Sequence, residues 1–169
     1  ETLIARSEAE DVEIVVFPEL SVTGYSCQDL FRQQTLLHSA EQAMERLLDF
    51  TRSRDVIAIV GCPLSLGNLL LNCAVVIQHG ELLGIVPKTF LPNYNEFYER
   101  RWFASSRDLQ PTEIVFAGKH TTISPAPILF RTQSRVTFGV EICEDVWAPQ
   151  PPSTRLALSG AEVIFNLSA

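Results

Sequence analysis

The chain of 169 residues has few of the residues that build metal centres or disulfide frameworks. Its four cysteines are scattered without a CxxC pair, so the sequence predicts neither a zinc site nor a disulfide framework. The three histidines lie in unrelated contexts, and no two of them have metal-ligand spacing. We therefore expect no metal site, and the cysteine usage favours a reducing, cytoplasmic compartment.

Long apolar runs and basic clusters are also missing. The stretch 69–77 is interrupted by Asn72 and falls far short of the roughly 20 residues that cross a bilayer. The formal net charge is −7 and basic residues occur only in short groups such as Arg100-Arg101, which argues against a nucleic-acid surface. The chain begins without Met or a leader-like segment. We expect a soluble piece of a longer protein, with neither nucleic acid nor membrane as a partner.

The residues that are present predict a single α/β domain. Hydrophobic residues make up 46% of the chain, enough for one core at this length. Three- and four-residue steps between apolar positions predict a long helix over 29–52, and composition predicts a helix over 1–10. Ser153 is expected to cap a short helix that ends near 158. Short apolar runs predict strands at 12–17, 56–60, 69–78, 81–86, 113–117, 121–123, 127–130, 136–142 and 162–167, with His79-Gly80 as a hairpin turn.

Cys143 lies where one of these strands stops. Apolar residues alternate along 136–142, and the alternation ends at the cysteine, which is followed by Glu144 and Asp145. A strand end holds the sulfur rigidly while the loop leaves it open to a ligand, which suits a nucleophile. The alternative is a small buried hydrophobe, the usual role of a free cysteine.

Two further ionisable residues follow strands. Glu19 comes directly after the strand 12–17 with apolar neighbours on both sides, and Lys88 follows the second hairpin strand. Each has a simpler interpretation as a solvated surface residue. Together with Cys143 they are chemically complementary, because a thiol needs a base, an oxyanion needs a cation and departing ammonia needs a proton.

The segment 91–103 is dense in aromatic and charged residues and has no clean period. Such a composition is typical of a loop and helix start that line a pocket. Its aromatic residues, Tyr94, Phe97, Tyr98 and Trp102, could instead belong to the core, and for Trp102 we favour that interpretation.

Three long motifs resemble a known family. They are FPELSVTGYSCQDLF at 17–31, PKTFLPNYNEFYERRWF at 87–103 and GVEICEDVWAPQPPS at 139–153. In this order they are similar to the glutaminase domains of glutamine-dependent NAD synthetases, within the nitrilase or carbon-nitrogen hydrolase superfamily. The resemblance covers essentially the whole chain and implies an α-β-β-α sandwich.

The resemblance also implies roles for individual residues. Glu19 is implied as general base and later acid, Lys88 as the group that stabilises the tetrahedral intermediate, and Cys143 as the nucleophile that forms a γ-glutamyl thioester. Glu96 matches the second glutamate of the superfamily, which orients the lysine and the substrate. The residues implied to line the glutamine pocket are Tyr25, Tyr94, Phe97 and Glu144.

Partners and cofactors follow from the same resemblance. Glutamine is the implied substrate, and a C-terminal synthetase domain, absent from these 169 residues, is the implied recipient of the ammonia. ATP and Mg are expected only in that domain, no cofactor is expected in this one, and a homo-oligomer is expected. The superfamily's first strand should precede Glu1 and further substrate contacts should follow Ala169, so the sandwich is expected to be incomplete at both ends.

Two other functions remain open from sequence. A free-standing amidase would act on another carboxamide with the same residues. A non-catalytic interaction module would keep the fold without the activity, but such a module has no physical need for Glu19, Lys88 and Cys143 together.

Overall fold

A four-stranded sheet forms the centre of the fold. The computed structural model describes all residues, 1–169. The sheet order is β1 (Ile14–Val16), β2 (Ile57–Leu66), β3 (Leu69–Gln78) and β4 (Glu81–Pro87). β1 pairs parallel with β2, and the other two pairings are antiparallel. β1 and β4 therefore run in the same direction, and their carboxyl ends lie at the same edge of the sheet.

The predicted hairpin between β3 and β4 is confirmed. The two turn residues have positive φ angles, 54° at His79 and 75° at Gly80. Positive φ at both central residues is what a two-residue type I′ turn requires, and it matches the twist of the strands that it joins.

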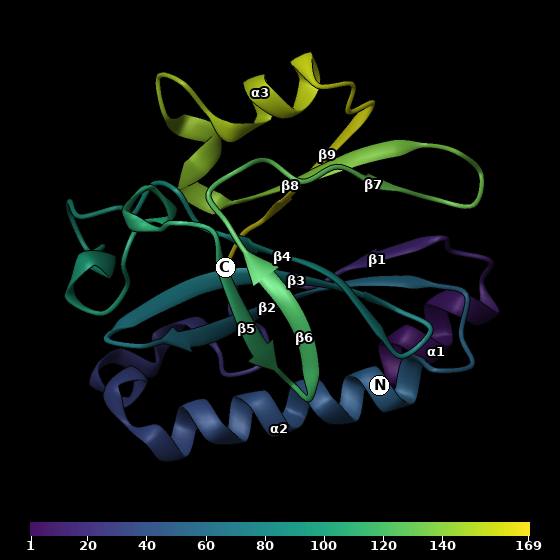
Figure 1. Ribbon diagram of the computed structural model, residues 1–169, viewed down its shortest axis with the longest axis horizontal. Coiled ribbons are helices and arrows are strands. Elements are labelled where there is room, and N and C mark those ends of the chain that lie inside the picture. Colours follow the sequence, from purple (N-terminus) through teal and green to yellow (C-terminus); the bar gives the residue numbers. More distant parts are fainter.

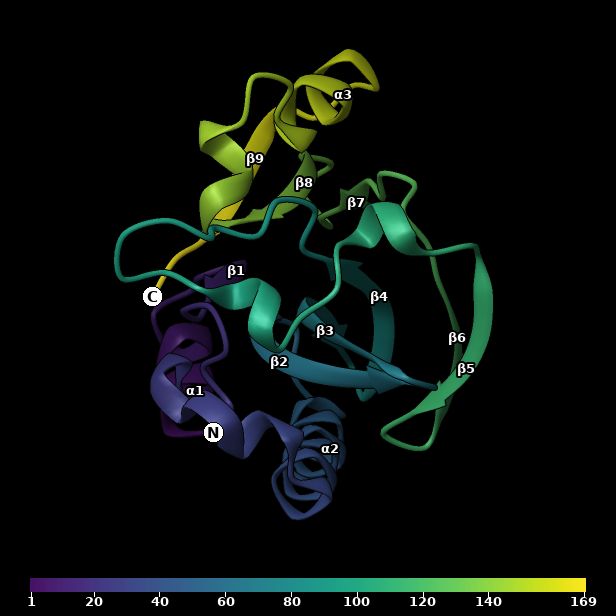
Figure 2. The same cartoon turned by 90° about the vertical axis from the view of Figure 1, so that its left-hand side faces the viewer.

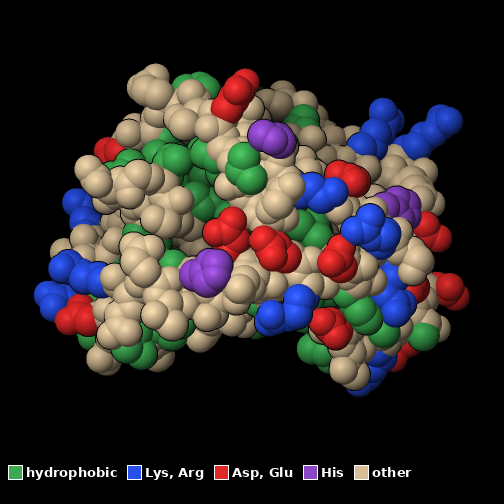
Figure 3. All heavy atoms as spheres, turned by 60° about the horizontal axis from the view of Figure 1, so that its bottom comes forward, with side chains coloured by type: hydrophobic (Ala, Val, Ile, Leu, Met, Phe, Trp, Pro, Cys, Tyr) green, Lys and Arg blue, Asp and Glu red, His purple; other side chains and the backbone are tan.

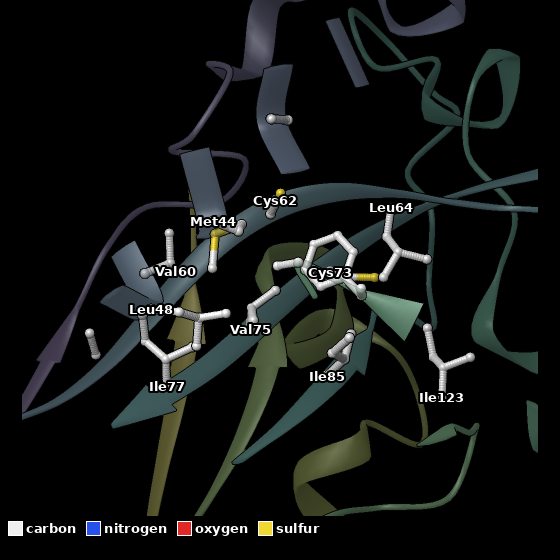
Figure 4. Packing of buried hydrophobic residues seen from close by; sticks show 14 of the residues in the cluster. Met44, Leu48, Val60, Cys62, Leu64, Cys73, Val75, Ile77, Ile85 and Ile123 are labelled. Atoms are coloured by element: carbon white, nitrogen blue, oxygen red, sulfur yellow. The ribbon is translucent and has the colours of Figure 1, made fainter. Parts of the chain in front are cut away.

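Both faces of β2 and β3 are buried, because alternate residues of each strand enter different cores. One face packs against α2 (Gln34–Thr51) and α1 (Thr2–Ala9). Figure 4 shows this core, in which side chains of α2 meet those of β2 and β3: Met44, Leu48, Val60, Cys62, Leu64, Cys73, Val75 and Ile77. The opposite face presents Ile57, Ile59, Ala74 and Val76 to a second sheet.

The second sheet contains β7 (Phe130–Arg131), β8 (Thr137–Ile142) and β9 (Val163–Leu167), with β8 and β9 parallel. α3 (Pro152–Leu158) covers its outer face, where a Cβ on Gly139 would lie 2.8 Å from the Leu156 side chain. Figures 1 and 2 show the layers in the order α2, first sheet, second sheet and α3. The predicted α-β-β-α sandwich is confirmed. A separate hairpin of β5 (Thr112–Phe116) and β6 (Lys119–Ile123) flanks the first sheet.

Several boundaries differ from those that the sequence predicts. The long helix begins at Gln34, because Tyr25–Arg32 forms 3-10 turns (η1) that Gln28 interrupts with a φ of 51°. The strand predicted at 127–130 is reduced to Phe130–Arg131. Ser153 is not the cap of α3: Pro151 takes that position, and the Ser153 N–H donates to the Glu141 carboxylate at 3.0 Å.

The outer surface around α2 carries charges of both signs. Figure 3 shows acidic and basic side chains interspersed on this face. None of the helices combines the length and hydropathy that a bilayer crossing requires.

Candidate active site

The three predicted reactive residues lie at the ends of strands from both sheets. Glu19 follows β1 and Lys88 follows β4 at the shared edge of the first sheet. Cys143 follows β8 and begins the 3-10 turn η4 (Cys143–Trp147). Glu19 and Lys88 both perturb the pKa of the Cys143 thiol, so the two sheets bring the three groups to one place.

Glu19 is held by a turn that crosses β2 at Gly61. A Cβ at position 61 would lie 2.3 Å from the Leu20 nitrogen and 2.5 Å from the Pro18 oxygen, so only glycine allows this close approach. The Gly61 N–H donates to Ser21 Oγ at 3.2 Å, and its carbonyl accepts from the Val22 N–H at 3.0 Å. The turn is thereby fixed to a central strand.

The Glu19 carboxylate is buried and its two oxygens have different surroundings. Oε1 accepts from Lys88 Nζ and from Asn72 Nδ2, both at 2.6 Å. Oε2 has no hydrogen-bond partner in the protein. One oxygen therefore anchors the side chain, while the other is free to accept a proton.

The Lys88 ammonium lies between two carboxylates. Its side chain is buried, and Nζ donates to Glu19 Oε1 at 2.6 Å and to the Glu99 oxygens at 2.8 and 2.9 Å. Burial by itself lowers the pKa of Lys88, but the charges and hydrogen bonds of Glu19 and Glu99 outweigh it and raise the pKa above its ordinary value. The group is a fixed cation at neutral pH.

The second glutamate of the site is Glu99 and not Glu96. Glu99 is 2% exposed in the 3-10 turn η2 (Glu99–Arg101), whereas Glu96 lies in the preceding exposed turn. Burial raises the pKa of Glu99, and Lys88 partly offsets this by favouring the carboxylate. The Tyr25 hydroxyl donates to Glu99 Oε1 at 2.8 Å, and burial next to this carboxylate raises the pKa of Tyr25. We therefore correct the assignment from Glu96 to Glu99.

Cys143 is half-buried and has a backbone φ of 44°, in the left-handed region that non-glycine residues seldom adopt. Burial raises the pKa of its thiol and the Glu19 carboxylate adds to this, while the Lys88 ammonium lowers it. The thiol is protonated at neutral pH and has a carboxylate at hand that can take its proton.

The predicted pocket residues divide into two groups. Tyr25 lies inside, against Glu99. The other three residues, Tyr94, Phe97 and Glu144, form a cluster at the surface. The Tyr94 hydroxyl donates to the Glu144 carboxylate at 2.8 Å, and the centroids of the Tyr94 and Phe97 rings lie 6.1 Å apart. Glu144 also lines a cavity of about 480 Å³ next to the loop that follows Lys88.

Asn72 is a site residue that the sequence analysis did not identify. It is buried in β3, and its amide donates to the same Glu19 oxygen that Lys88 contacts. The sequence does contain a signal for this residue, because Asn72 interrupts an otherwise apolar run. A buried amide in such a run needs a polar partner.

The arrangement contains the parts of covalent amide hydrolysis. It places a thiol beside a carboxylate with a free oxygen and beside a fixed ammonium, which can serve as nucleophile, proton carrier and oxyanion stabiliser. No group of three or more His, Cys, Asp and Glu side chains has the geometry to hold a metal ion.

The chain is similar in sequence to known enzymes. Over 170 residues the chain is 42% identical to the glutamine-dependent NAD(+) synthetase of Mycobacterium tuberculosis, covering 98% of this chain and 24% of that protein. It is 38% identical to that of Aquifex aeolicus over 161 residues, covering 95% of this chain and 25% of the relative. The chain thus spans about a quarter of the length of these curated relatives.

Solved structures give the same fold. A glutamine-dependent NAD(+) synthetase from Cytophaga hutchinsonii matches 98% of this chain and 26% of its own with a TM-score of 0.78 and 29% identity. An amidase of the nitrilase superfamily from Nesterenkonia matches 99% of this chain and 56% of its own with a TM-score of 0.76, and its 20% identity supports the fold alone. The family model of the carbon-nitrogen hydrolases matches residues 1–169, and the chain therefore belongs to that family.

Proposed function

We propose that the chain is the glutaminase domain of a glutamine-dependent NAD synthetase. The single observation that carries the proposal is the buried Lys88 ammonium, bonded to Glu19 and Glu99 and near enough to Cys143 to lower the pKa of its thiol. The identity of 42% to an enzyme whose name specifies glutamine supports this substrate over other carboxamides.

The first half of the reaction forms a thioester. Glu19 Oε2 takes the thiol proton, and the Cys143 sulfur attacks the side-chain carboxamide carbon of glutamine. The oxyanion that forms is stabilised by Lys88, with the Glu144 N–H, the amide next to the nucleophile, as a second donor. The carbon–nitrogen bond breaks, and ammonia leaves with the proton that Glu19 returns.

The second half releases glutamate. Glu19 takes a proton from water, the resulting hydroxide attacks the thioester carbonyl, and the sulfur leaves as a thiolate that recovers the proton from Glu19. Glu99 keeps Lys88 in place through both halves. Tyr25, Tyr94, Phe97 and Glu144 are proposed to line the glutamine pocket.

Ammonia is proposed to pass to a synthetase domain outside these residues, where it reacts with adenylylated nicotinic acid adenine dinucleotide. That domain would hold ATP and Mg, and no metal is assigned to the glutaminase chemistry. A homo-oligomer in the cytoplasm belongs to the same proposal. The proposal of a further domain is supported by the length of the NAD synthetase relatives, of which this chain covers about a quarter.

The test uses Cys143→Ala in the full-length protein. Glutamine-dependent NAD synthesis should be lost while ammonia-dependent synthesis persists, because only ammonia production needs the thiol. Cys27→Ala is the matched control, since Cys27 is also partly exposed but bonds only to backbone carbonyls of its own turn. Both activities should survive in the control.

Other outcomes would identify a different function. Retention of glutamine-dependent synthesis in Cys143→Ala would contradict the proposal. A wild-type protein that hydrolyses another carboxamide through Cys143 but not glutamine would be a free-standing amidase. A wild-type protein without any amide hydrolysis would be an interaction module.

A further inference from the structure

Asp145 lies two residues after the nucleophile and is 1% exposed, yet the proposed chemistry does not use it. Its carboxylate accepts hydrogen bonds from backbone N–H groups. Burial raises its pKa to about 6, so the ionised form is costly to hold inside the protein. A buried charge kept at such a cost calls for a specific function of its two oxygens.

The two Asp145 oxygens bind different strand ends. Oδ1 accepts from the backbone N–H groups of Thr89 at 3.1 Å and Phe90 at 2.7 Å, the two residues directly after Lys88. Oδ2 accepts from the Ile142 N–H at 3.1 Å, directly before Cys143. One carboxylate therefore ties the end of β4 in the first sheet to the end of β8 in the second.

The backbone of Cys143 needs such support. Its φ of 44° is unfavourable for a residue with a Cβ, and such conformations persist only where surrounding contacts hold them. The bond from the Ile142 N–H closes the turn around Cys143, and the bonds to Thr89 and Phe90 fix where this turn sits relative to Lys88.

We propose that Asp145 is a positioning residue that sets the distance and orientation between the Lys88 ammonium and the Cys143 sulfur. This inference rests on the proposed function, because it concerns the same thiol and ammonium. A purely structural cap of η4 would need only the oxygen that faces Ile142. The second oxygen, bonded to the loop after Lys88, is what points to positioning.

Asp145→Asn tests the proposal with the least change in shape. A side-chain amide has one acceptor oxygen. If that oxygen keeps the hydrogen bonds from the Thr89 and Phe90 N–H groups, the amide NH₂ faces the Ile142 N–H, and two donors oppose each other. The turn around Cys143 must then shift relative to Lys88. We expect kcat for glutamine to fall about 100-fold in the full-length protein, because displacements near 1 Å have effects of this size. KM should stay near the wild-type value.

A second readout does not need glutamine. The rate at which iodoacetamide alkylates Cys143, followed by peptide mass spectrometry, should be lower in Asp145→Asn than in wild type, because Lys88 then lowers the thiol pKa less. Loss of the Asp145 charge alone would favour the thiolate and speed alkylation. The sign of the change therefore separates displacement from simple loss of charge.

Asp49→Asn is the matched control, since Asp49 is exposed on α2 and pairs only with Arg52. Its kcat, KM and alkylation rate should equal those of wild type. If Asp145→Asn does not fold, Asp145→Glu keeps the charge and both oxygens but adds one methylene. If Asp145→Glu loses turnover of glutamine but still unfolds cooperatively, and is therefore folded, the result would support a positioning role.

Some results would overturn the inference. Suppose that a folded Asp145 variant has the kcat of wild type and that its Cys143 is alkylated at the same rate or faster. Asp145 would then be only a structural cap of η4. A wild-type protein that does not hydrolyse glutamine would contradict the proposed function alone, because slower alkylation in Asp145→Asn would still support positioning.

Discussion

The interior of the candidate site and its rim are built differently. Lys88 and Glu99 are 1% and 2% exposed and bonded to each other, whereas Tyr94 at the rim is 50% exposed and bonds to Glu144 at the surface. Charges in the interior interact strongly because little water screens them, and those at the rim interact weakly. The interior is thus fixed before substrate arrives, while the rim can adjust to what it binds.

The largest expected effect comes from Lys88→Met, which removes the charge of the interior but keeps much of its volume. Turnover of glutamine should fall about a thousandfold, because the oxyanion loses its cation. The free energy of unfolding should fall by about 3–5 kcal/mol at neutral pH, because two buried carboxylates lose their partner. Kinetics and denaturant titration would measure the two losses.

The pH dependence of Lys88→Met has a defined sign. Burial raises the pKa of Glu99, and without the ammonium this rise is no longer offset, so folding favours the protonated form of Glu99. The stability that this proton confers is present at low pH and is lost as pH rises through the raised pKa. The stability difference from wild type should therefore be smaller at pH 5 than at pH 8, and a difference independent of pH would contradict the buried ion pair.

A second prediction concerns the two glutamates of the segment 91–103, of which Glu99 lies in the interior and Glu96 is exposed. Glu99→Gln should reduce kcat about 100-fold, because Lys88 loses the carboxylate that fixes its position. Glu96→Gln, three residues earlier and exposed, should leave kcat near wild type. Steady-state kinetics of both variants would decide, and the reverse order would restore the assignment to Glu96.

The smallest effect is expected at the rim. Tyr94→Phe removes the hydroxyl that donates to Glu144 and keeps the ring that meets Phe97. Since this bond is exposed, KM for glutamine should rise only a few-fold and kcat should change little. A loss of kcat comparable to that of Glu99→Gln would mean that Tyr94 belongs functionally to the interior.

The sequence predicts best those features that depend on neighbouring residues. The hairpin of β3 and β4 was predictable because alternation and the His79-Gly80 turn are local signals. The positions of Glu19, Lys88 and Cys143 at strand ends were predictable for the same reason. Their convergence was an expectation from chemistry and family resemblance, and the structure brings them together.

The choice between Glu96 and Glu99 could not be made from sequence. Both lie in an aromatic segment without hydrophobic periodicity, so the sequence pattern does not show which of the two side chains faces the interior. The fold decides, because the Glu99 N–H donates to the Pro92 carbonyl and the Glu99 carbonyl accepts from Phe103, which packs on Phe31. Contacts with η1, far away in sequence, thus turn Glu99 inward.

The most direct measurement is covalent labelling of the full-length protein with a diazo-ketone analogue of glutamine, followed by peptide mapping. A cysteine whose thiol lies near a base and a fixed cation should react, and excess glutamine should protect it. We predict one label per chain, on Cys143. Labelling at Cys27, Cys62 or Cys73, with Cys143 unmodified, would contradict the convergence of Glu19, Lys88 and Cys143 on one reactive site.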